Sequence, residues 1–176
     1  GCGNGKLIEH VFDIIYYKTN RGKQLDKHPL IIIGSDFNQK ALEATQKTIQ
    51  KADIWAQTAI GDISDPETLA KKIKNKYQIN LEDLLNIRSF LDHNRIYTPP
   101  NQKIYTKSKS SGAFCFKGER INNATLQQNL KEHLEKWCPY LKKYGLLIVE
   151  LHTIHPEHAA NNIGETAITA YDASHG

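Results

Sequence analysis

The feature that most constrains the fold of this chain is a repeated switch between two hydrophobic periods. Short apolar runs typical of buried strands alternate with longer segments whose apolar residues recur at helical spacing. The predicted strands cover residues 30–33, 54–60, 84–90 (which could run on into a helix) and 146–149. The predicted helices begin near residues 7, 38, 65 and 126, and the last of them ends at Gly145. Because strands that alternate with helices pair in parallel, we predict an α/β fold, Rossmann-like, with an open, mainly parallel sheet and helices on both faces.

The composition excludes several classes of protein. A length of 176 residues favours a single domain, residues 1–176. The content of 39% hydrophobic and 24% charged residues excludes a disordered or fibrous chain. No apolar run approaches the roughly 20 residues that span a bilayer. The three cysteines lie far apart without a CxxC pair, which excludes a disulfide framework and favours a cytoplasmic location. A formal net charge of +4 is too small to indicate a nucleic-acid partner.

A glycine-rich turn stands directly before the first predicted helix. Gly1, Gly3 and Gly5 make up this turn, with Cys2 between the first two glycines. Such a turn lets a ligand approach the backbone, and the helix start offers free N–H groups to an anionic group, although glycine turns also occur for packing alone. Lys6 stands where the dinucleotide-binding motif has its third glycine. A small zwitterion, such as the methionine part of S-adenosylmethionine, therefore fits better than a pyrophosphate.

Acidic residues follow the next two predicted strands. Asp36 could accept the hydroxyls of a ribose, or it could cap the helix that begins near Asn38. Phe37 could cover an adenine ring or belong to the core. Asp62 could accept the adenine amino group while Ile63 packs on the ring, or Asp62 could be an ordinary turn residue. Since each signal follows a strand, and ligands of such sheets bind beyond the carboxyl ends of the strands, together they favour a nucleoside site.

With these segments in view, the chain resembles class I S-adenosylmethionine-dependent methyltransferases. The resemblance rests on GCGNG at 1–5, GSDFN at 34–38 and GDI at 61–63. A narrower resemblance, to methyltransferase domains of bacterial polyketide synthases of the apratoxin loading-module type, rests on NIRSFLDHNRIY (86–97), SGAFCFKGERI (111–121), GLLIVELHTIHPEH (145–158) and the YDASHG ending.

The resemblance implies S-adenosylmethionine as the cofactor, held by the glycine turn and by the positions of Asp36 and Asp62. It also implies a larger sheet, so we expect one strand upstream of Gly1, further strands after Gly176, and hence an internal segment of a longer chain. The implied reaction is methyl transfer to carbon or oxygen of a small organic acceptor, including an acyl or polyketide-type acceptor on an acyl carrier protein. Two alternatives stay open: an RNA or protein methyltransferase, and a non-catalytic module that binds a nucleoside or a partner.

Two residues that each follow a predicted strand are candidates for the reacting end of the site. If those strands are neighbours, His93 and Glu150 can face one cleft, where Glu150 would orient His93 as a base. The resemblance supports a His/Glu pair, although His93 falls several residues later than the family's histidine and Ser89 lies nearer to that place. The alternative is that Glu150 pairs with an arginine and that His93 is a surface residue. His152 is the second candidate for the base.

A histidine triplet near the end of the chain has the even spacing of some metal sites. His152, His155 and His158 are each three residues apart. Because Pro156 interrupts a helix there and no carboxylate pattern accompanies the histidines, no metal site is predicted.

Residues 96–123 lack a hydrophobic period and carry five lysines and arginines. We predict a long loop, which could be a lid over the acceptor or a dock for an acidic carrier protein. An ordinary solvated loop is the alternative.

Overall fold

The computed structural model describes residues 1–92, 95–102, 104, 107–109, 114–150, 156–162 and 164–165. The chain divides into two units. The first comprises Gly1–Ser89 with Pro139–Leu147, and the second comprises Phe90–Cys138 with Ile148–Gly176. Among the residues of these ranges, no helix is long and apolar enough to cross a membrane.

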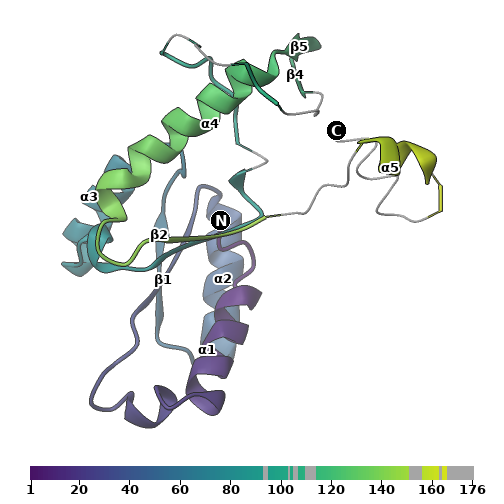
Figure 1. The fold of residues 1–176 in the computed structure, drawn as a ribbon. Helices are drawn as coiled ribbons and strands as arrows, with labels where there is room; N and C mark the ends of the chain where they lie inside the picture. The colour runs from purple at the N-terminus through teal and green to yellow at the C-terminus, as the bar shows by residue number, and fades with distance from the viewer. Residues whose placement is uncertain are drawn as a thin grey trace. The chain divides into compact units, whose positions relative to one another are not determined.

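The first unit alternates helices and strands along the chain, and α1 packs against α2 within it (Figure 1). Its elements are α1 (Lys6–Lys18), β1 (Ile32–Asp36), α2 (Gln39–Lys51), β2 (Ala56–Ile60), α3 (Pro66–Tyr77), β3 (Asn86–Ser89) and the first half of β6 (Leu146–Val149). Single 3-10 turns stand at Gly22–Gln24 and Leu81–Asp83.

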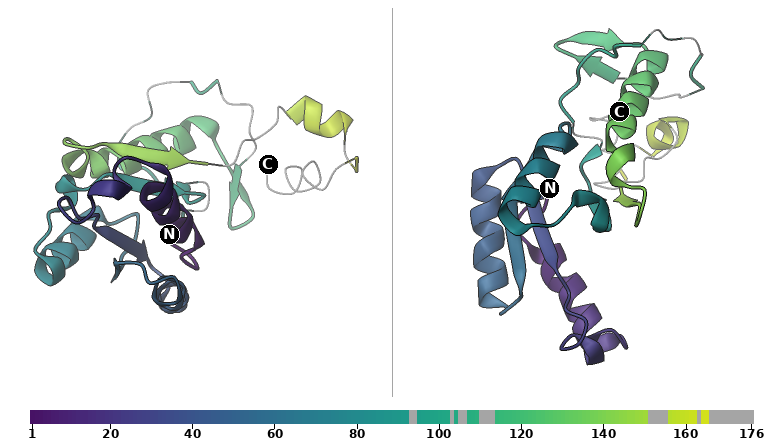
Figure 2. Two further views of the ribbon diagram at one scale, coloured as in Figure 1. Left: turned by 90° about the horizontal axis from the view of Figure 1, so that it is seen from below. Right: turned by 90° about the vertical axis from the view of Figure 1, so that its left-hand side faces the viewer.

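β1 and β2 form a parallel pair joined by α2. Ile32 lies opposite Ala56 and Asp36 lies opposite Ile60. α2 packs against both strands, and α3 packs against β2 (Figure 2). The parallel crossover through a helix confirms the α/β class. The buried apolar side chains of this unit are Leu25, Leu42, Ile49, Ile54, Ala59, Leu69, Ile73 and Leu81.

The helices α2 and α3 each begin at a capping side chain. The Asn38 side chain accepts a hydrogen bond from the Lys40 backbone N–H, so α2 begins there. The Asp65 side chain accepts one from Thr68 N–H, and Pro66 occupies the first turn of α3, where its missing donor carries no penalty.

The predicted strand at 30–33 is displaced in the structure. β1 begins at Ile32 and continues to Asp36, while Ile31 is 54% exposed. Burial on both faces was therefore a wrong expectation, because only Gly34 and Asp36 of the strand are buried. The physical reason is that β1 has a single strand neighbour within the described residues, so the apolar run is not enclosed.

β3 and β6 form another two-stranded sheet. In the first unit, Asn86 N–H donates to Gly145 C=O at 3.3 Å, and in the second unit, Phe90 N–H donates to Val149 C=O at 2.8 Å. Both strands fall within the predicted segments 84–90 and 146–149, so the two strand predictions are confirmed.

The second unit contains a helix, a hairpin and the second half of β6. Its elements are β4 (Phe114–Phe116), β5 (Glu119–Ile121), α4 (Asn123–Trp137) and α5 (Pro156–Asn161). The hairpin turns at Lys117 and Gly118, whose φ angles of 54° and 82° suit a tight two-residue turn. The prediction of one long loop over 96–123 missed this hairpin, since strands of three residues are too short to show a period.

α4 ends earlier than predicted, and polar side chains share its buried face with apolar ones. It stops at Trp137, since Pro139 has no N–H group with which to continue the helical hydrogen bonds, and a 3-10 turn follows at Cys138–Tyr140. The helical spacing predicts an apolar stripe of Leu126, Leu130, Leu134, Trp137 and Leu141. Of this stripe, Trp137 is buried and Leu130 is 38% exposed, while Asn129 and His133 are buried as well. Pro156 likewise begins α5 instead of interrupting a helix, because proline suits the first helical position.

Candidate functional site

The glycine turn is a tight loop fixed to β1. Gly5 N–H donates to Cys2 C=O at 2.9 Å, and Cys2 N–H donates to Ser35 C=O at 2.9 Å. Gly3 and Gly5 have φ angles of 55° and 79°, the region that favours glycine. A Cβ atom on Gly5 would lie 3.1 Å from the Thr45 Cα atom, whereas one on Gly3 would meet nothing within 4 Å. Gly5 therefore serves packing against α2, and Gly3 borders open space that a ligand could enter.

Asp36 joins the glycine turn to the start of α2. Its side chain is buried at 7% exposure. Its Oδ2 atom accepts from Gly3 N–H at 3.1 Å, and its Oδ1 atom accepts from Asn38 N–H at 3.0 Å. Since Asn38 is the residue that caps α2, the capping alternative for Asp36 is wrong. A carboxylate has about four acceptor positions, so two backbone bonds leave capacity for further donors.

Two threonines of α2 hold the carbonyl groups of the glycine turn, and sequence reasoning missed both. The Thr45 hydroxyl donates to Gly3 C=O at 2.9 Å, and the Thr48 hydroxyl donates to Asn4 C=O at 2.7 Å. The only signal in the sequence is a pair of hydroxyl residues three apart on an apolar helix face.

The Cys2 side chain also faces α2, where the Thr45 Oγ atom lies 3.3 Å from its sulfur. Burial raises the pKa of the Cys2 thiol, and the contact with Thr45 opposes this rise. The thiol is therefore protonated at neutral pH, so it is a poor nucleophile.

The residues that follow Asp36 and β2 meet at the same edge of the parallel pair. Gly61 N–H donates to Asp36 C=O at 2.9 Å. Phe37 is 68% exposed, so the core alternative for this ring is wrong. Asp62 is exposed, and its Oδ1 atom accepts from Ser64 N–H at 2.8 Å and from the Ser64 hydroxyl at 2.7 Å, which is the bonding of a turn residue. Ile63 is half-buried beside it.

In the second unit, Glu150 holds the segment that follows β3. Its Oε1 atom accepts from Leu91 N–H at 2.9 Å and from Asp92 N–H at 2.7 Å. The condition that these two strands are neighbours is met, because β3 and β6 pair in one sheet. His93 and His152 lie outside the described residues, so the base they were expected to supply stays a prediction.

A buried polar pair lies next to this contact, and sequence reasoning missed it. The His133 Nε2 atom of α4 lies 3.2 Å from the Asp92 Oδ1 atom, and the two side chains are 4% and 9% exposed. One turn earlier on α4, Asn129 donates to Thr98 C=O at 2.6 Å and accepts from Arg95 at 3.2 Å. The sequence signal was a histidine and an asparagine four apart, which the leucine stripe of the same helix obscured.

The first part of the predicted 96–123 loop is bound to α4. The Glu132 carboxylate accepts from Asn101 N–H and Gln102 N–H, each at 2.9 Å. These backbone donors hold the pKa of the Glu132 carboxyl below its usual value. Residues 101 and 102 are therefore tied to the helix, which argues against a wholly solvated loop.

The histidine triplet is described only at His158, which is exposed in α5; His152 and His155 lie outside the described residues. In the part of the chain that the structure describes, no three histidine, cysteine or acidic side chains gather as metal ligands.

A cavity of about 510 Å³ lies between α2, β2 and α3. Its lining includes Lys72 and Lys76, which donate to the Ile60 and Thr58 carbonyl groups at 3.4 and 3.3 Å. These lysines cover the outer edge of β2, a common protection against unwanted strand pairing. None of the predicted site residues lines this cavity.

Comparison with known proteins shows a family match over the whole chain. A methyltransferase family described as the AprA MT2-like domain matches residues 1–176. No curated protein matches the chain. The matched range contains the glycine turn, Asp36 and Glu150, together with every segment on which the resemblance rests.

Proposed function

Since the chain belongs to the family of AprA MT2-like methyltransferase domains, we propose that it is an S-adenosylmethionine-dependent methyltransferase. We propose as its acceptor a small organic or carrier-bound acyl compound of the polyketide type, methylated at carbon or oxygen. The observation that carries the proposal is the bond between Asp36 and Gly3, because it joins an acidic strand end to a glycine turn at one edge of a parallel pair.

The residues at this edge fit S-adenosylmethionine. Gly3 borders open space, and the Asp36 carboxylate beside it retains acceptor capacity for the ribose hydroxyls. The exposed ring of Phe37 would stack on the adenine ring, and this contact would account for the exposure of so large an apolar side chain. Asp62 and Ile63 follow the neighbouring strand, where they would contact the adenine amino group and ring. Gly1, Cys2 and Gly5 complete the turn that holds the amino-acid part.

For the reacting end, we retain His93 and Glu150 as the proposed base and its orienting carboxylate. When bound, S-adenosylmethionine supplies an electrophilic methyl group. His93 would take a proton from the acceptor carbon or hydroxyl, and Glu150 would stabilise the charge formed on the imidazole. The position of Glu150 supports this role, because its two backbone bonds fix it beside the segment that leads to residue 93. His152 is the second proposed base.

The acceptor is proposed to arrive on an acyl carrier protein. The sequence of segment 96–123 contains five lysines and arginines, and cationic residues suit the acidic surface of such a carrier.

Calorimetric titration with S-adenosylhomocysteine tests the cofactor site. We expect Asp36→Ala to weaken binding by about 10- to 100-fold, since a hydrogen bond to a charged group contributes about 1.5–3 kcal/mol. Asp26→Ala, at an exposed aspartate outside the site, is the matched control and should bind as the wild type does. Thermal unfolding of each variant shows whether the fold is retained.

The results also separate the alternatives. Absence of binding by the intact wild-type protein would contradict the methyltransferase proposal. Tight binding without methylation of any acyl-thioester would favour the non-catalytic module, and salt-dependent RNA binding would favour an RNA methyltransferase.

A further inference from the structure

The segment after β3 is held from two directions within the second unit. Directly after β6, the Glu150 carboxylate accepts hydrogen bonds from the backbone N–H groups of Leu91 and Asp92. From α4, His133 lies 3.2 Å from the side chain of the same Asp92. Asp92 thus donates its backbone N–H to Glu150, and its side chain lies against the imidazole of His133.

The contact between His133 and Asp92 has a free-energy cost, because it buries two polar side chains. A buried charged or polar pair loses its hydration, and an apolar pair of similar size often gives equal or greater stability. α4 has apolar side chains available, yet Leu130 is 38% exposed while His133 is 4% exposed. Trp137, also 4% exposed, supplies the apolar burial of this helix, and the polar pair beside it supplies one fixed geometry at Asp92.

The charges around Asp92 are consistent with a fixed carboxylate. Burial lowers the pKa of the Arg95 guanidinium, and the nearby charge of Asp92 opposes this change. Arg95 is itself held by the Asn129 side chain, one helical turn from His133. Within the second unit, the Arg95 guanidinium and the His133 imidazole thus both lie close to Asp92.

We propose that Asp92 and His133 are positioning residues for Glu150. His133 fixes the Asp92 carboxylate. The fixed position of Asp92 in turn fixes the backbone N–H groups of Leu91 and Asp92, which orient the Glu150 carboxylate. The inference rests on the proposed methyl transfer, in which Glu150 orients the base. Neither residue is assigned a contact with the cofactor or acceptor.

The test compares His133→Ala with His133→Gln in the full-length protein. Glutamine keeps an N–H donor near the place of the Nε2 atom, so it should restore what alanine removes. Amide hydrogen exchange at Leu91 and Asp92 reports the geometry, and methylation of an acetoacetyl-N-acetylcysteamine thioester reports kcat and KM. His10→Ala, an exposed histidine of α1, is the matched control.

For His133→Ala, we expect exchange at both amides to be at least about tenfold faster and kcat to fall by about a hundredfold, the effect of a misplacement of about 1 Å. The affinity for S-adenosylhomocysteine should stay within about twofold, because that site lies in the first unit. His133→Gln should recover most of both losses. If alanine disrupts the fold, Asp92→Asn provides the same comparison with less loss of volume.

Unchanged exchange at Leu91 and Asp92 in a folded variant would overturn the inference, whatever happens to turnover. An equal loss of kcat in the glutamine and alanine variants would also overturn it, since this would show a requirement for histidine itself. Failure of the proposed function is seen separately, as absence of cofactor binding by the wild-type protein.

Discussion

The glycine turn is held at almost every polar atom that it presents. Gly3 N–H donates to Asp36, Gly3 C=O accepts from Thr45, and Asn4 C=O accepts from Thr48. Because backbone groups that lose water must find partners, these side chains define the path of the turn. The turn is thus held in one conformation, which would reduce the entropy lost on binding of the cofactor proposed above.

Replacement of the Thr45 hydroxyl should destabilise the turn. Thr45→Val keeps the shape of a fully buried side chain but leaves Gly3 C=O without its donor. We expect the free energy of unfolding to fall by about 1–3 kcal/mol, the penalty for an unsatisfied buried acceptor. Urea unfolding measures this loss.

Thr48→Val is the matched control, because its bond to Asn4 C=O is exposed and water can replace it. A loss below about 0.5 kcal/mol is expected there. Equal losses for the two variants would show that burial does not distinguish the two bonds.

At the level of residues, the sequence predicted Asp36 better than it predicted the contacts of Asp36. Its position after a strand was visible, because an apolar run before an acidic residue is a local pattern. The donors Gly3 and Asn38 and the supporting Thr45 were not visible, since they come together only through tertiary packing. The same holds for His133, whose partner Asp92 is 41 residues away in sequence (133 − 92).

Helices and strands show a similar division between local and non-local information. The starts of α2 and α3 follow from capping side chains that can be identified in the sequence. The start of β1 and the short hairpin β4–β5 depend on which partner strand is present. The predicted apolar stripe of α4 was correct at Trp137 and wrong at Leu130, because the polar side chains Asn129 and His133 are buried as well.

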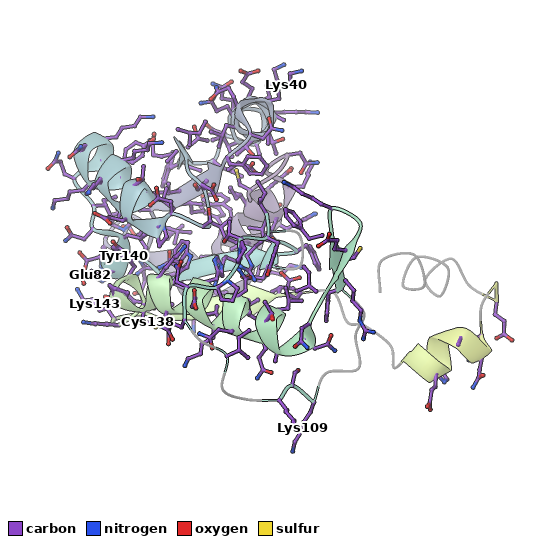
Figure 3. All side chains as sticks on the ribbon, turned by 90° about the horizontal axis from the view of Figure 1, so that it is seen from above. Lys40, Glu82, Lys109, Cys138, Tyr140 and Lys143 are labelled. Carbon is purple, nitrogen blue, oxygen red and sulfur yellow. The ribbon has the colours of Figure 1, made fainter. Side chains whose placement is uncertain are left out.

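An ion pair joins two distant segments of the first unit. Lys143 precedes β6 and its ammonium lies 2.6 Å from Asp83 of the 3-10 turn before β3; Figure 3 shows Lys143 beside Glu82, the neighbour of Asp83. Lys143 and then Asn80 hold the pKa of the Asp83 carboxyl below its ordinary value. A carboxyl with a lowered folded-state pKa adds stability above its unfolded pKa, about 3.9, and this stability disappears as the pH falls through the lower folded pKa.

We therefore expect Asp83→Asn to be less stable than the wild type at pH 6 and nearly equal to it in strong acid. The difference should be small and should shrink at high salt, because the pair is exposed. Urea midpoints between pH 2 and pH 7 measure it. Lys71→Gln, in the exposed pair with Glu67 on α3, is the control that tests a pair local to one helix. A difference that grows toward low pH would contradict the assigned sign.

On the scale of the whole chain, the two units are stabilised by different interactions. The buried apolar side chains of the described residues belong to the first unit except Trp137. The second unit relies on polar contacts along α4, such as those of Asn129, His133 and Glu132. This contrast was not predicted from the sequence, because the leucines of α4 indicate an apolar face.

Native-state hydrogen exchange of the full-length protein should reveal this difference. Apolar burial opposes local opening, so the amides of β2 should exchange only at a higher free energy than those of α4. Ile73→Ala, which truncates a side chain 2% exposed in the first unit, should lower the opening free energy of the β2 amides by about 2–5 kcal/mol. Leu130→Ala, at a 38% exposed site of α4, should change either value by less than about 0.5 kcal/mol. Equal opening free energies for β2 and α4 in the wild type would mean that the chain unfolds as one cooperative body, and the separate stabilisation of its two units would then be wrong.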